Sequence, residues 1–146
     1  MNLPGRVFVD TSFLIALLNS QDADHAAAVS LQVDLKTQKT FKIISEYILL
    51  EFCDGLAKLR YRDLAVRSVE LLKCDRTVEI IPASSQILHA AWQLFKSRDD
   101  KEWGLTDCTS FVIMRQLGLH VALTADRHFQ QAGFQASLLQ SDQPID

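Results

Sequence analysis

The stretch "RVFVDTSFLIALL", residues 6–18, contains the pattern that decides the fold. The apolar run "VFV" is typical of a short buried strand, and it ends directly on Asp10. The apolar residues after Asp10 predict a helix that begins within two positions of this acid. The same order recurs in "VALTADRHF", residues 121–129, where two residues separate an apolar run from Asp126. The chain therefore places a carboxylate at the carboxyl end of two predicted strands.

The rest of the chain alternates between segments with a strand pattern and segments with a helix pattern. Apolar and β-branched residues predict strands at 7–9, 40–44, 77–82, 119–124 and 134–139. Helices are predicted at 12–20, 26–33, 46–60, 62–74, 83–97, 106–118 and 126–133. Short apolar strands separated by helices indicate an α/β fold, a three-layer α/β/α sandwich with a central, mainly parallel sheet. Ligands of such sheets bind outside the carboxyl ends of the strands, which is where Asp10 and Asp126 are expected.

Composition predicts one domain, residues 1–140, followed by a polar tail at 141–146. The chain has 146 residues, of which 48% are hydrophobic and 23% are charged, as in ordinary globular domains. No apolar run approaches the roughly 18 residues that span a bilayer, and residues 1–6 show no secretory signal, so a cytoplasmic location is expected. Three scattered cysteines without a CxxC pair predict free thiols and no zinc site.

Four acids stand out by their positions: Asp10, Glu51, Asp107 and Asp126. Each has an ordinary explanation, because acids commonly cap helices or lie in their first turns, with Thr106 the expected cap beside Asp107. Glu51 lies between apolar residues of a predicted helix, where it either is buried or faces solvent. Together the acids could converge on one crevice, where unpaired carboxylates repel by roughly 4 kcal/mol per pair at 4 Å. A hard divalent cation, Mg²⁺ or Mn²⁺, relieves that repulsion.

Carboxylates around such a cation suit metal-assisted attack on a phosphodiester. The net charge of −3 argues against a protein that coats nucleic acid through basic residues, although an acidic metal site weakens this inference. A phosphatase of the HAD type would need a second aspartate two residues after the first, and Ser12 occupies that position. A response-regulator receiver domain would need an acidic acceptor on the middle strand and a late lysine, which the corresponding segments lack.

The sequence resembles the PIN domain family, and specifically the small VapC-type ribonuclease toxins of toxin–antitoxin pairs. The resemblance covers almost the whole chain and rests on four blocks in order: "VFVDTSFLIALL", "IISEYILLEFCDGL", "DKEWGLTDCTSFVIMRQLG" and "ALTADRHFQQAGF". It implies a Mg²⁺-dependent endoribonuclease with RNA as its substrate, a homodimer, and a cognate antitoxin that covers the acidic cleft. Gly104 departs from the family, in which serine is common at this position.

The resemblance also implies residue roles. Asp10 and Asp107 would be the principal metal ligands, and Glu51 and Asp126 would complete the site, around either one or two ions. Ser12 matches a small polar residue that supports the first aspartate. A PIN-like module that binds RNA or protein without catalysis is the alternative, although such modules lose acids that this chain keeps.

For two further groups of residues, the sequence leaves two alternative roles open. Acids just upstream of Gly104 either join the outer shell of the metal or form a solvated loop: Asp99, Asp100 and Glu102. The densest basic cluster either contacts RNA or antitoxin or forms an exposed helix face: Lys58, Arg60, Arg62 and Arg67. His128 is a weaker candidate for contact with the substrate.

Overall fold

The computed structural model describes residues 1–139, so the predicted tail at 141–146 lies outside the described residues. Within these residues, five strands form one sheet: β1 (Arg6–Val9), β2 (Phe41–Ser45), β3 (Val78–Ile81), β4 (Val121–Leu123) and β5 (Gln135–Ala136). Their order is β3-β2-β1-β4-β5, and every neighbouring pair is parallel. The predicted parallel sheet is confirmed.

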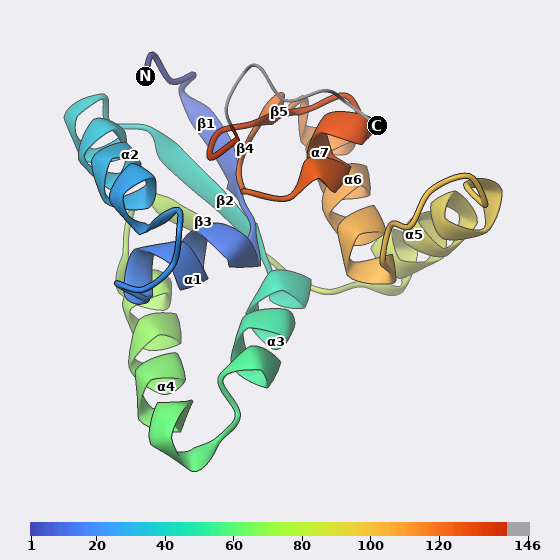
Figure 1. Ribbon diagram of the computed structural model, residues 1–146. Coiled ribbons are helices and arrows are strands. Elements are labelled where there is room, and N and C mark those ends of the chain that lie inside the picture. The colour runs from blue at the N-terminus through green and yellow to red at the C-terminus, as the bar shows by residue number, and fades with distance from the viewer. Residues whose placement is uncertain (140–146) are drawn as a thin grey trace.

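Helices cover both faces of this sheet: α1 (Thr11–Leu18), α2 (His25–Thr37), α3 (Glu46–Gly55), α4 (Leu59–Cys74), α5 (Ser85–Ser97), α6 (Leu105–Leu117) and α7 (Arg127–Gln131). Figure 1 shows α1, α2 and α4 on one side of the strands and α5, α6 and α7 on the other. This arrangement confirms the three-layer α/β/α prediction. None of the described helices combines the length and apolar composition that crossing a membrane requires.

The core forms where the continuous apolar strands meet the helices. Val7 and Phe8 of β1 have no exposed surface, which explains why this strand shows no polar alternation. On the α6 and α7 side, the Phe111 and Phe129 rings pack edge to face with centroids 5.0 Å apart, and both are fully buried. This contact fixes α7, although α7 has only five residues.

The chain reverses direction across the sheet between β1 and β4. It runs outward from β1 through β2 to the edge strand β3, and α5 and α6 then return it to β4 on the other side of β1. The Asp10 N–H donates to the Leu123 carbonyl at 3.2 Å, so the two strands stay together up to their carboxyl ends. Diverging connections at such a reversal leave a crevice, and the segments after β1 and β4 border it.

The predicted continuous helix at 46–60 is wrong at residues 56–58. Helix α3 ends at Gly55, and a short connection leads to α4, which begins at Leu59. Leu56 has φ −115° and ψ 24°, outside the helical region. Gly55 precedes this break, and glycine weakens a helix by about 1 kcal/mol relative to alanine, so the interruption falls where the helix is least stable.

Candidate metal centre

Asp10 is the most deeply buried acid of the site, with 6% of its surface exposed. It caps α1 from the end of β1, and its Oδ2 accepts hydrogen bonds from the hydroxyls of Ser12 (2.8 Å) and Thr124 (2.7 Å). The N–H of Ala125 donates to Ser12 Oγ at 3.0 Å, and that of Asp126 donates to Thr124 Oγ1 at 2.9 Å. The loop after β4 thus orients both hydroxyls toward one carboxylate oxygen.

Asp107 lies in the first turn of α6, but Thr106 does not cap this helix, contrary to the sequence prediction. The cap residue is Gly104, whose N–H donates to Asp107 Oδ2 at 3.1 Å. The same oxygen lies 2.9 Å from His128 Nδ1. Asp107 therefore holds the start of its own helix while remaining at the crevice.

Asp126 caps α7 and accepts a 2.9 Å hydrogen bond from the His128 N–H through Oδ1. The His128 ring turns back, so that Nδ1 is 3.4 Å from this oxygen. Asp107, Asp126 and His128 each offer a ligand atom, and these atoms lie within 4.8 Å of one another. The three side chains could thus contact one metal ion.

Glu51 joins these residues from α3. The structure places it on the exposed face of the helix, while the next residue, Phe52, is fully buried. Of the two alternatives for Glu51, burial among apolar neighbours is wrong. Its solvent-facing side is nevertheless a wall of the crevice, so it reaches the other acids without being buried.

The crevice is an open cleft of about 500 Å³, and all four predicted acids line it. Ser12 and His128 line it as well. Two acids that sequence reasoning did not select, Asp22 and Asp24, lie at the same cleft on the connection between α1 and α2. Among the described residues, six carboxylates therefore border one open space.

The electrostatics of the cleft fit a divalent cation. Burial raises the pKa of Asp10 from its usual 3.8 to about 6, the Thr124 and Ser12 hydrogen bonds oppose this rise, and the charges of Asp126 and Glu51 add to it. Burial likewise raises the pKa of Asp107. Within residues 1–139 no lysine or arginine forms an ion pair with any of the four predicted acids. A hard cation with oxygen ligands supplies the missing positive charge.

The other candidate residues lie elsewhere. Of the acids before α6, Asp100 forms an ion pair with Arg98 at 2.9 Å, and neither it nor Asp99 nor Glu102 is among the described residues that line the cleft. In the basic cluster, Arg67 pairs with Asp63 at 2.9 Å, and Arg62 donates to the Ala57 carbonyl. The structure thus gives two members of this cluster local partners, one on α4 and one in the connection before it.

Sequence reasoning missed Thr124, Asp22 and Asp24. The pattern "TAD" after β4 offered a signal for Thr124, because a threonine two residues before an acid at a strand end can reach the same crevice. The "QDAD" connection offered none, because acids are ordinary in exposed loops. Only the packing of α1 and α2 against the sheet brings this connection to the cleft.

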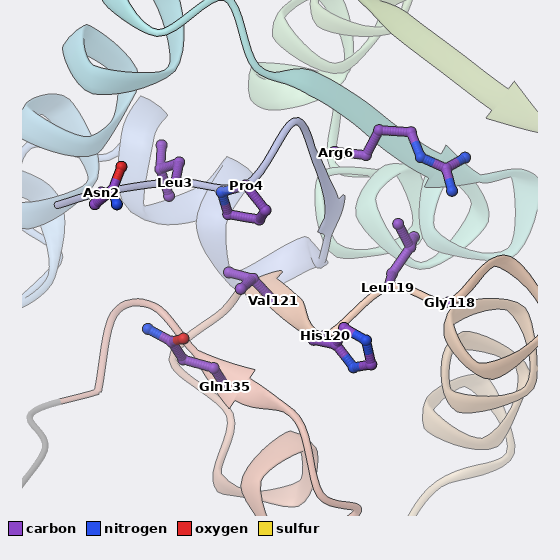
Figure 2. A pocket seen from close by; sticks show the side chains of 9 residues that line it. All are labelled: Asn2, Leu3, Pro4, Arg6, Gly118, Leu119, His120, Val121 and Gln135. Carbon is purple, nitrogen blue, oxygen red and sulfur yellow. The ribbon is translucent and has the colours of Figure 1, made fainter.

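A second cavity, of about 460 Å³, lies at the opposite end of β1 and β4. Figure 2 shows its lining, with Arg6 and His120 near the amino ends of these strands. The Arg6 guanidinium donates to the Leu117 carbonyl at 2.8 Å. None of its nine labelled lining residues is an acid, so the described lining offers a cation no carboxylate.

Comparison with known proteins gives consistent matches. The model of the PIN domain family matches residues 7–135. The 23S rRNA-specific endonuclease VapC20 of Mycobacterium tuberculosis is 30% identical over 128 residues, which cover 88% of this chain and 95% of the relative. The crystal structure of VapC20, described as a Sarcin-Ricin loop cleaving toxin, superposes with a TM-score of 0.76 at 29% identity, over 88% of this chain and 95% of that one.

More distant structures share the fold. VapBC-1 from nontypeable Haemophilus influenzae matches with a TM-score of 0.63 at 17% identity, over 92% of this chain and 99% of that one. DNA-bound VapBC from Salmonella typhimurium matches with a TM-score of 0.65 at 16% identity, over 90% of this chain and 96% of that one. With the family model covering most of the chain and the parallel sheet and acidic cleft in place, the protein belongs to the PIN domain family.

Proposed function

We propose that this protein is a Mg²⁺-dependent endoribonuclease and the toxin of a toxin–antitoxin pair. The observation that carries the proposal is the convergence of Asp10, Glu51, Asp107 and Asp126 on one open cleft at the reversal point of the sheet. The identity to an endonuclease named for 23S rRNA supports the reaction class. Folded RNA, with 23S rRNA as the first to be tested, is the proposed substrate.

In this proposal Asp10 and Asp107 are the principal metal ligands, and Glu51 and Asp126 complete the site. The hydroxyls of Ser12 and Thr124 fix Asp10 through one oxygen, so its carboxylate needs little reorganisation when it binds a cation. A bound divalent ion supplies Lewis acidity, which activates water and offsets the charge that develops on the phosphodiester.

The cleft explains why an RNA phosphate needs the metal. Six carboxylates repel the phosphate backbone when no cation is present, and the chain as a whole carries a charge of −3. The openness of the cleft admits a strand or loop of RNA instead of enclosing a small molecule. The same negative charge suits a partner that covers the cleft with basic side chains.

The proposed partners are a cognate antitoxin and a second copy of this chain. The VapBC structures with the same fold support an antitoxin. An exposed apolar face on α5 supports self-association: Leu88, Trp92 and Phe95 are 45%, 46% and 41% exposed, and the Trp92 and Phe95 rings stack at 5.7 Å. Exposed aromatic residues of this kind are enriched at protein interfaces.

A cleavage assay tests the proposal. We expect the purified protein to cut RNA in Mg²⁺ and to stop cutting in EDTA, and we expect Asp10→Asn and Asp107→Asn to lower the rate at least ~100-fold. Asp99→Asn is the matched control, because it removes an exposed acid outside the cleft and should cut like the wild type. Equal cleavage by all four proteins would indicate a contaminating nuclease, and a wild type without activity would favour the non-catalytic binding module.

A further inference from the structure

The imidazole of His128 lies against two carboxylates of the cleft. Its Nδ1 is 2.9 Å from Asp107 Oδ2, a good hydrogen-bond distance, and 3.4 Å from Asp126 Oδ1, where a hydrogen bond is weak. The side chains of His128 and Asp107 are 29% and 17% exposed, so water screens this contact only in part. The family resemblance assigns His128 no role in the metal site.

The fold holds this ring in place from both sides. The neighbouring residue, Phe129, is fully buried and packs on Phe111, which lies one helical turn after Asp107 on α6. At the backbone, the His128 N–H is bound to the carboxylate of Asp126. These contacts fix the backbone that carries the ring, and the ring then joins α7 to Asp107 of α6. A histidine on an unpacked surface helix would instead populate several rotamers.

The direction of the hydrogen bond follows from the acceptor. An ionised carboxylate has no proton to donate, so Nδ1 carries the hydrogen and donates it to Asp107 Oδ2. This oxygen also accepts the Gly104 N–H at 3.1 Å. Two donors on one oxygen restrict the rotation of the carboxylate, just as two hydroxyls restrict that of Asp10.

We propose that His128 is a positioning residue, which orients Asp107 for metal binding through its Nδ1–H. This inference rests on the proposed metal site. The rival role is that of a nitrogen ligand, since the three ligand atoms lie within 4.8 Å of one another. Because Nδ1 donates its hydrogen to Asp107, it has no free lone pair, and a ligand role would have to use Nε2. The geometry therefore assigns the positioning role to Nδ1 and makes Nε2 the atom that the rival role requires.

The two roles predict different behaviour of side-chain replacements. The amide nitrogen of asparagine can take the place of Nδ1, whereas that of glutamine reaches the place of Nε2. We therefore expect His128→Ala and His128→Gln to weaken the binding of Mg²⁺ and of Mn²⁺ about tenfold, with the ratio of the two affinities unchanged. His128→Asn should restore most of the affinity for both ions.

Isothermal titration calorimetry with each metal, without RNA, is the measurement. His120→Ala is the matched control, because His120 lies at the amino end of β4, in the opposite cavity, and its loss should leave metal affinity unchanged (Figure 2). Thermal melting of each variant in EDTA establishes that it is folded. Since His128→Asn keeps both the polarity and the donor, it stays informative even if the alanine variant is unstable.

The inference is overturned if His128→Ala binds both metals like the wild type. It is also overturned if His128→Asn fails to restore metal affinity and His128→Ala loses more affinity for Mn²⁺ than for Mg²⁺. That result would indicate a lost nitrogen ligand, because Mn²⁺ accepts nitrogen ligands more readily than Mg²⁺ does. Failure of the proposed function gives a different result: the wild type binds metal and shows the His128 effect but cuts no RNA. If Asp10→Asn and Asp107→Asn bind metal normally, the metal site itself is wrong.

Discussion

Thr124 holds Asp10 through its hydroxyl, and an isosteric change isolates this contact. Thr124→Val removes a donor that lowers the pKa of Asp10 and leaves the Asp126 N–H without its acceptor. We expect metal affinity at pH 7 to fall roughly tenfold, as calorimetry would measure. Thr40→Val is the matched control, because Thr40 Oγ1 is buried without a hydrogen-bond partner among the described residues. Its loss should leave metal binding unchanged and stability equal or higher.

The raised pKa of Asp10 predicts a pH-dependent stability. The folded protein binds this proton more tightly than the unfolded chain, so the contribution to stability is present below pH 3.8 and is lost as pH rises through about 6. The loss amounts to about 3 kcal/mol, from roughly two pKa units at 1.36 kcal/mol each. A bound cation should reverse it above pH 6 and have little effect at pH 5.

Urea unfolding in EDTA and in Mg²⁺, between pH 4.5 and 8, measures this effect. Asp10→Asn cannot titrate and should remove most of the metal-dependent difference. If the wild type gains the same stability from Mg²⁺ at pH 5 and at pH 7.5, the cation does not bind at Asp10.

At the level of the residue, sequence reasoning selected the four acids and Ser12, and the structure brings all of them to one cleft. Asp10 and Asp126 could be selected because they follow strands, and the carboxyl ends of parallel strands share one edge of the sheet. Glu51 on α3 and Asp107 on α6 were selected from their places in helices and from the family resemblance. The roles of these residues in metal binding stay predictions. Contacts such as His128 with Asp107 could not be predicted, because they join segments 21 residues apart through the packing of α6 on α7.

Helix α6 has a glycine at each end, Gly104 at the N-cap and Gly118 at the C-cap, and the two glycines have different roles. Gly104 has φ −72° and ψ 163°, and an added Cβ would meet only Asp107 Oδ2 at an ordinary 3.8 Å, so a side chain fits there. Gly118 has φ 67°, in the left-handed region that disfavours other residues. The two positions form a matched pair within one element.

We expect Gly104→Ser to stabilise the protein by about 0.5 kcal/mol, because serine is a better N-cap and reduces the entropy of the unfolded chain. Gly118→Ser should instead destabilise it by about 1 kcal/mol. Urea unfolding of both variants checks the pair. A destabilised Gly104→Ser protein would mean that the added hydroxyl competes for the Asp107 hydrogen bond.

Among the elements, the strands that became β1, β2 and β3 were predicted well, and the helix between Glu46 and Arg60 was predicted worst. The strand predicted at 134–139 is four residues too long, because β5 covers only Gln135–Ala136. A strand of three or four apolar residues has few alternatives once turns flank it. The sequence "DGLAKLR" has a helical composition apart from one glycine, and composition does not record that the chain must turn there to lay α4 beside β3. Tertiary packing decides such a break.

For the whole molecule, we expect a homodimer that uses the α5 face. Trp92→Glu places a charge among Leu88, Trp92 and Phe95 and should convert the dimer to a monomer, as light scattering coupled to gel filtration would show. Val33→Glu on α2, where Val33 is 59% exposed, is the control and should leave the dimer intact. If only the control disrupts the dimer, the interface lies on the α2 side; a monomeric wild type would contradict self-association.

The sequence by itself determined the order of strands and helices, the parallel sheet and the two acids that follow strands, Asp10 and Asp126, because hydrophobic periodicity and strand-end positions are local properties. Only the tertiary structure decided which neighbours hold those acids. Thr124 reaches Asp10 from 114 residues away, and Asp22 and Asp24 join the cleft from a loop. The physical reason is that a hydrogen bond or a charge acts over a few ångströms in space, and the strand order 3-2-1-4-5, set by packing, decides which distant residues come that close.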